Sequence, residues 1–193
     1  MSKIDAPLIW VWPVRCLHWL LVLSVVCAWL TRSWLGPWHA YFGYVALGVV
    51  SLRIYLGLRS QNCYVRFDQF VRSFEVTRGY ARSVLMRHAH RHLGHNPLGG
   101  CMIVALLATI GLLGLTGWLY TTDWFWGDGW LANLHAAIGW LLICLIVLHI
   151  GGVLLSSVLH RENLVLSMFT GHKRALQGSE VRPRKLQDER QLD

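Results

Sequence analysis

Four histidines lie within long apolar stretches, where ionisable side chains are costly and usually face the interior of a helical bundle. They are His18, His39, His135 and His149. At about 3.6 residues per turn, His135 and His149 are close to four full turns apart on one helix. Their side chains therefore point the same way, about 21 Å apart along the helix axis. Any single one of these histidines can instead be a packing residue that hydrogen-bonds to a neighbouring helix.

The four histidines match in depth as two pairs. His39 and His135 each open an apolar stretch on one side, whereas His18 and His149 lie towards the other side. Two facing imidazoles coordinate one haem iron from both sides and give a six-coordinate electron-transfer centre. Zinc prefers four ligands with thiolate or carboxylate among them, and each level offers only two histidines. The pattern therefore predicts two b haems, one held by His39 and His135 and the other by His18 and His149.

The cysteines and glycines are compatible with haem that is held by side chains alone. None of the five Cys belongs to a C-x-x-C-H motif, which excludes covalently attached haem. Gly43, Gly139 and Gly152 each follow a histidine by about one turn and would leave room for a flat macrocycle. The alternative is helix packing through small residues. We favour that alternative for three glycines of the third stretch, Gly111, Gly114 and Gly117.

Two arginines lie close to the predicted His18–His149 level. Arg15 is three residues before His18, and Arg53 is near the end of the second apolar stretch. Both can bind the propionates of that haem, because a guanidinium matches a carboxylate in geometry. Both can equally extend to the membrane interface. The sequence leaves these two interpretations open.

The apolar stretches predict four membrane spans that position these residues. Apolar residues make up 54% of the chain and charged residues 15%, which excludes a soluble enzyme, a disordered protein and a disulfide scaffold. A membrane helix needs about 20 mostly apolar residues. We predict an all-α membrane protein with four transmembrane helices. The spans are residues 13–35, 37–58, 97–121 and 131–159.

The basic residues predict the orientation of the spans, because cytoplasmic loops are rich in Lys and Arg. The loop over residues 121–130 has neither residue. Both termini and the long middle loop are therefore predicted to be cytoplasmic, and the charge of +8 reflects topology rather than nucleic-acid binding. The arginines of the middle loop are Arg59, Arg66, Arg72, Arg78, Arg82, Arg87 and Arg91.

The middle loop itself contains a helical pattern. Phe67, Phe70, Val71 and Phe74 have the spacing of an amphipathic helix, which we expect to lie at the membrane interface or, alternatively, to bind a partner. Asn96 and Pro97 are suited to begin the third span as N-cap and first helical residue. Residues 1–174 are predicted to form the four-helix domain, and residues 175–193 a disordered cytoplasmic tail.

With these residues in place, the chain resembles the bacterial cytochrome b561 family and the b-type cytochrome subunits of membrane-bound nickel–iron hydrogenases and formate dehydrogenases. The resemblance covers roughly residues 8–174. The matching segments are Arg15-Cys-Leu-His18-Trp19, His39-Ala-Tyr-Phe-Gly43-Tyr44 to Arg53-Ile-Tyr55, Gly94-His95-Asn96-Pro97-Leu98-Gly99, His135 to His149, and Arg161-Glu-Asn-Leu near Thr170-Gly-His-Lys173.

The resemblance implies a four-helix bundle with two stacked b haems in the bacterial inner membrane, and quinone chemistry at a haem edge. It assigns the iron ligands to His18, His39, His135 and His149. The loop before the fourth span is shorter than in hydrogenase subunits, so this chain looks more like stand-alone or cytochrome-c-coupled members.

We therefore expect transmembrane electron transfer between a periplasmic donor and the membrane quinone pool. The donor would be a c-type cytochrome or a dehydrogenase or hydrogenase subunit. One alternative is an enzyme that passes electrons from superoxide to quinone without a partner, with Trp124, Trp126 and Trp130 at its rim. An alternative of another class is a haem-free membrane anchor or transporter.

Overall fold

The computed structural model describes residues 8–33, 36–62, 64–69, 73–86 and 96–173. Within these residues the secondary structure consists of helices joined by turns and loops, with one isolated antiparallel bridge between Leu8 and His172. The elements are α1 (Trp12–Thr31), α2 (Trp38–Arg59), the 3-10 turn η1 (Phe67–Gln69), α3 (Phe74–Leu85), α4 (Pro97–Tyr120), α5 (Gly129–Leu159) and α6 (Leu164–Thr170).

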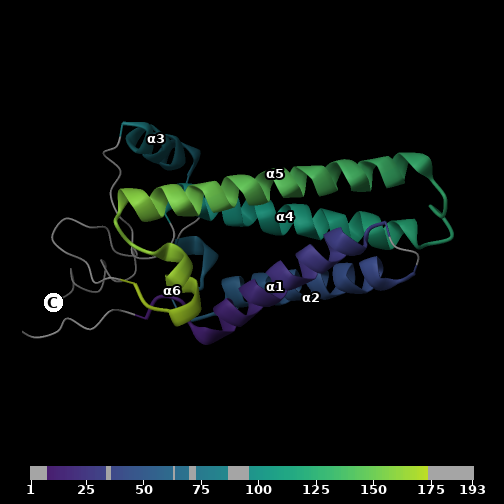
Figure 1. Ribbon diagram of the computed structural model, residues 1–193, viewed down its shortest axis with the longest axis horizontal. Coiled ribbons are helices and arrows are strands. Elements are labelled where there is room, and N and C mark those ends of the chain that lie inside the picture. The colour runs from purple at the N-terminus through teal and green to yellow at the C-terminus, as the bar shows by residue number, and fades with distance from the viewer. Residues whose placement is uncertain (1–7, 34–35, 63, 70–72, 87–95, 174–193) are drawn as a thin grey trace, which may run out of the picture. The chain divides into compact units, whose positions relative to one another are not determined.

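The helices α1, α2, α4 and α5 are each long and apolar enough to cross a membrane (Figure 1). Their exposed side chains are largely Leu, Val, Ile and Trp, as expected of surfaces that face lipid. A helix suits this environment because it satisfies its backbone hydrogen bonds internally. The prediction of an all-α protein with four spans is confirmed. The first span ends at Thr31, whereas residues 34–35 of the predicted span lie outside the described residues.

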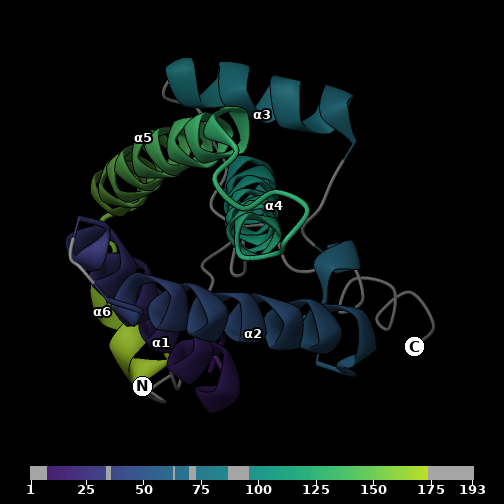
Figure 2. The ribbon, with the colours of Figure 1, turned by 90° about the vertical axis from the view of Figure 1, so that its right-hand side faces the viewer.

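The chain divides into two compact units. The second unit comprises residues 16–55 and 104–148, and it contains most of the four spans. Side-chain contacts in this unit join the helices in the cyclic order α1, α2, α4, α5. Figure 2 is viewed from the end at which α1 ends and α2 begins. The contacts are His39 with Ala28, Leu47 with Gly114, Thr116 with His135, and Trp140 with Trp29.

The first unit comprises residues 1–15, 56–103 and 149–193, and within it α3 packs against the beginning of α4. The Thr77 hydroxyl lies 3.8 Å from the Cys101 sulfur, and Tyr80 hydrogen-bonds to the Asn96 side chain. Burial raises the pKa of Tyr80 above its ordinary value, and the hydrogen bond to Asn96 opposes this shift. The Asn96 side chain also accepts the Gly99 N–H at 2.7 Å, which confirms the predicted cap of the third span.

The helix expected between spans two and three begins at Phe74, the last residue of the predicted amphipathic pattern. Phe67 lies in η1, Phe70 and Val71 lie outside the described residues, and the α-helix starts only at Phe74. The prediction of a helix between spans two and three is confirmed, but this α-helix begins at Phe74 rather than at Phe67. Its first turn contains Glu75, and Thr77 and Tyr80 contact residues at the start of α4.

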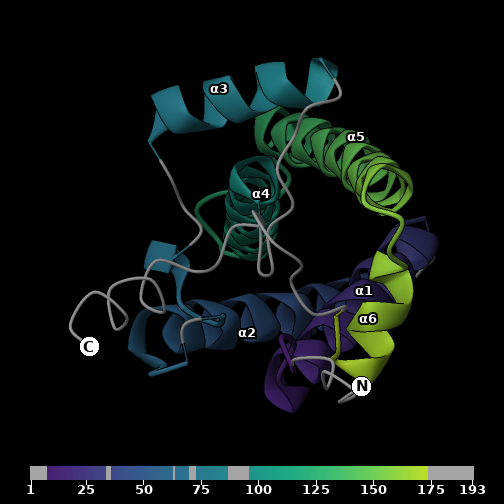
Figure 3. The ribbon, with the colours of Figure 1, turned by 90° about the vertical axis from the view of Figure 1, so that its left-hand side faces the viewer.

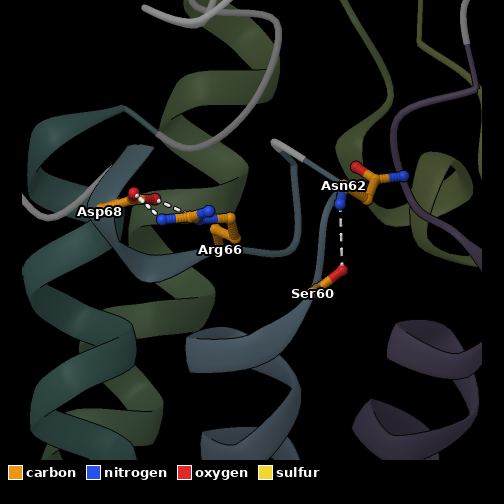
Figure 4. Close-up of polar contacts among 4 residues, drawn as sticks. All are labelled: Ser60, Asn62, Arg66 and Asp68. Atoms are coloured by element: carbon orange, nitrogen blue, oxygen red, sulfur yellow. Dashed lines mark hydrogen bonds and ion pairs between the residues drawn. The ribbon is translucent and has the colours of Figure 1, made fainter.

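The segment that follows α2 is organised by local polar contacts (Figure 4). The Asn62 N–H donates to the Ser60 hydroxyl at 3.1 Å, and Arg66 makes a two-point contact with Asp68 at 3.1 and 2.5 Å. Because this ion pair is exposed, it contributes at most about 1 kcal/mol. The Phe67 ring then packs against Gly57 in the last turns of α2, where there is no side chain to obstruct it.

The N-terminal segment is bound to α6 and the residues after it, and α6 lies beside the start of α1 in Figure 3. The N–H groups of Ile9 and Trp10 both donate to the Gly171 carbonyl, at 2.9 and 3.0 Å. The Trp10 indole N–H donates to the Ser167 hydroxyl at 3.3 Å. Gly171 ends α6 with a φ of 86°, a conformation that disfavours any side chain. This arrangement anchors the chain just before the first span.

Candidate functional site

His39 and His135 face each other within the second unit. His39 lies in the first turn of α2 and His135 in the second turn of α5, and their ring centroids are 6.0 Å apart. The ring planes are nearly perpendicular, at 85°. Because α2 and α5 are opposite in the cyclic order of helices, this contact crosses the interior of the unit. Both side chains are partly buried.

One ring nitrogen of His39, Nδ1, is hydrogen-bonded to the neighbouring helix α1. His39 Nδ1 lies 2.9 Å from the backbone carbonyl oxygen of Ala28 in α1. A carbonyl can only accept, so Nδ1 carries the hydrogen. In a neutral imidazole the other nitrogen, Nε2, then has the lone pair that a metal needs.

His135 is held in the same tautomer by a side chain of α4. The Thr116 hydroxyl oxygen is 2.9 Å from His135 Nδ1 and 2.8 Å from the backbone carbonyl oxygen of Leu112. A hydroxyl has one hydrogen, and the carbonyl can only accept it. The Thr116 oxygen therefore accepts from His135 Nδ1–H, which again leaves the lone pair of a neutral imidazole on Nε2. Ligating histidines commonly donate their second N–H to such an acceptor.

The spacing and the donor set suit one metal ion between the two rings. When two imidazole nitrogens each lie about 2 Å from the same ion on opposite sides, their ring centroids are about 6 Å apart. Within the described parts of the chain, no group of three or more His, Cys, Asp or Glu could hold a metal ion. Two imidazole donors suffice for haem iron, because the macrocycle supplies the remaining four nitrogens.

The glycines of this unit differ in what surrounds them. A Cβ added at Gly43 would have no atom within 4 Å, whereas one at Gly139 would approach the Trp29 ring at 4.0 Å. Gly117 lies against the imidazole of His135, since a Cβ there would be 3.3 Å from Cε1. For Gly117 the interpretation as a helix-packing residue was therefore incomplete. It gives the His135 ring space beside α4. Gly152, in the first unit, also has open space around it.

Aromatic side chains and one arginine cover α1 and α5 near these histidines. Trp29 contacts Trp140 edge to face, with ring centroids 5.1 Å apart. The Arg32 guanidinium lies 4.3 Å from the Trp29 ring centroid and also donates to the Trp29 carbonyl at 2.7 Å. Such a cation–π contact contributes about 0.5–1 kcal/mol at an exposed site. It fixes the end of α1 beside the His39–His135 pair.

The other two histidines belong to different compact units. His18 lies in α1 within the second unit, where its ring contacts that of Trp19 edge to face with centroids 5.1 Å apart. His149 lies in α5 at the start of the first unit's third segment, and it is partly buried. The pairing of His18 with His149 stays a prediction.

The two arginines are placed as follows. Arg15 donates to the carbonyl of Phe169 at the end of α6, and its Nε is buried with no partner among the described residues. Arg53 is 8% exposed within α2, so its guanidinium is not extended into solvent. Whether either residue binds a propionate stays a prediction.

Thr116, which contacts His135, is a residue that the sequence patterns did not single out. The third span has no histidine, and its glycines were interpreted only as packing residues. The sequence feature that could have indicated Thr116 is its hydroxyl between Gly114 and Gly117, near the end of the third span. This position is at the same depth as His135, near the start of the fourth span.

Comparison with protein-family models gives a match to the prokaryotic cytochrome b561 family over residues 9–171. Comparison with curated proteins and with solved structures gave no match. The family match covers all four spans and the four histidines. The chain therefore belongs to the prokaryotic cytochrome b561 family, whose members are multi-pass membrane proteins that bind b-type haem and transfer electrons across the membrane.

Proposed function

We propose that this chain carries electrons between a periplasmic donor and the membrane quinone pool through two bis-histidine b haems. The first haem would be held by His39 and His135, and the second by His18 and His149. Residues 1–174 would form the relay, and residues 175–193 would be a cytoplasmic tail. The donor would be a c-type cytochrome or a dehydrogenase or hydrogenase subunit.

The facing pair His39 and His135 carries this proposal. Their ring centroids are 6.0 Å apart, and each Nδ1 is bound to a fixed acceptor on a neighbouring helix. This arrangement supports bis-histidine ligation because each Nδ1 donates its hydrogen to an acceptor on a neighbouring helix, which leaves Nε2 of the neutral imidazole for a metal. When bound, haem supplies a centre that accepts and releases one electron.

The spacing of His135 and His149 along α5 supports a relay rather than a single centre. At about 1.5 Å per residue, one continuous helix separates them by about 21 Å. The hydrocarbon core is about 30 Å thick, so a single centre would leave an electron far from one surface. Two centres at different depths would divide this distance.

The basic residues support a cytoplasmic location for both termini, because Arg and Lys are concentrated in the middle loop and after the fourth span. The His39–His135 site would then lie near the periplasm, where it would meet the donor. A reporter fused after Asp193 is expected to be active only in the cytoplasm. Activity of a periplasmic reporter at this position would reverse the orientation and move this site to the other face.

The haem content of the purified chain tests the proposal directly. A reduced-minus-oxidised spectrum combined with a protein assay is expected to give two low-spin b haems per chain. A redox titration is expected to resolve two one-electron components that are reduced by quinol or by the periplasmic donor. A ratio of one haem per chain would contradict the two-site relay.

A further inference from the structure

We propose that Thr116 is a positioning residue that sets the redox potential of the haem held by His39 and His135. Its hydroxyl oxygen accepts the Nδ1 hydrogen of His135, while its own hydrogen is bound to the Leu112 carbonyl. This inference rests on the proposed ligation by His135, and it assigns a role to a helix that contributes no ligand of its own.

The location of Thr116 makes its hydrogen bond persistent. Thr116 is 6% exposed, and its hydroxyl is bound to the backbone of its own helix, so water does not readily replace it. The neighbouring Gly117 lets the His135 ring approach α4, since a Cβ there would be 3.3 Å from Cε1. Thr116 thus holds the imidazole by a polar contact, and Gly117 leaves room for the ring beside α4.

A hydrogen bond to the second nitrogen makes an imidazole more basic towards the metal. A more basic ligand stabilises ferric iron more than ferrous iron and so lowers the midpoint potential. The two ligands differ in this respect, because His39 Nδ1 donates to the Ala28 carbonyl and His135 Nδ1 donates to a hydroxyl. The acceptor for His135 is a side chain of α4, so a substitution of Thr116 can remove this hydrogen bond, whereas the backbone acceptor for His39 would remain.

Thr116→Val keeps the shape of the side chain but removes the acceptor. Outer partners of this kind typically change metal affinity or activity by about 10–100-fold, and we expect the preference for ferric over ferrous iron to fall by about the lower of these factors, tenfold. For a one-electron couple this raises the midpoint potential of one haem by about 59 mV. Thr116→Ala, which adds no bulk, is expected to shift the potential in the same direction, and Thr116→Ser should restore the wild-type value.

Thr109→Val is the matched control. Thr109 lies two turns earlier on α4, is also 6% exposed, and donates to the Ala105 carbonyl at 2.8 Å in the same way. We expect this variant to leave both potentials unchanged. Redox titration of the purified holoprotein measures all four variants, and haem content is recorded alongside.

The titration separates this inference from the proposed function. Unchanged potentials in Thr116→Val and Thr116→Ala would overturn the role of Thr116, and so would a shifted potential in Thr116→Ser. An equal shift in Thr109→Val would show a general effect of α4 and would also overturn it. If His135→Leu retains both haems, the ligation itself is wrong, whatever the Thr116 variants do.

Discussion

Replacing His135 by leucine is expected to halve the haem content of the purified chain, and replacing His39 is expected to remove the same haem. The two ring centroids are 6.0 Å apart. Under the proposed ligation, each variant would remove one of the two ligands of the same iron. Leucine preserves the apolar volume within the span. The missing component should have the same potential and absorption maximum in both variants, as measured by redox titration with spectral detection.

The control for this pair is His172→Leu. His172 is exposed, lies outside the four spans, and its Nδ1 is 3.0 Å from the Thr170 carbonyl oxygen. This variant is expected to keep both haems. His18→Leu and His149→Leu should both remove the second component and leave the first. The pairing is refuted if His39→Leu and His135→Leu remove different components, or if each leaves both in place.

The spans and the depth of each histidine could be predicted from sequence for a simple physical reason. An apolar stretch long enough to cross the bilayer forms a helix, and each residue then has a depth set by the rise per residue. This argument alone puts His39 and His135 at one level. The cap at Asn96 was predictable as well, because an Asn followed by Pro is suited to a helix start.

Contacts between helices were not predictable in this way. The sequence indicates the depth of Thr116 but not that α4 turns this hydroxyl towards α5, since helix rotation is decided by packing such as that of Leu47 on Gly114. The helix after α2 was displaced because a periodic run of phenylalanines does not show where a helix begins. Helix α6 was also missed, although Asn163 and Gly171 are typical capping residues.

A leucine at Gly43 is expected to reduce the haem content from two per chain to about one while the helices remain folded. Gly43 lies one turn after His39 on α2, and a Cβ there meets no atom of the protein within 4 Å. The protein alone therefore has open space where the side chain would begin, whereas a flat macrocycle beside His39 would occupy this space. Haem content and helix content by circular dichroism are measured on the same sample.

Gly48→Leu distinguishes loss of space from a general effect on the helix. Gly48 lies on the same helix and also has no atom within 4 Å of an added Cβ, but it is exposed whereas Gly43 is partly buried. A leucine at Gly48 would extend into lipid, so both haems should be retained. An equal loss of haem in the two variants would mean that leucine disturbs α2 in general rather than the space for the macrocycle. Full haem content in Gly43→Leu would mean that the macrocycle does not lie against this face of α2, because a leucine side chain and a porphyrin cannot share that volume.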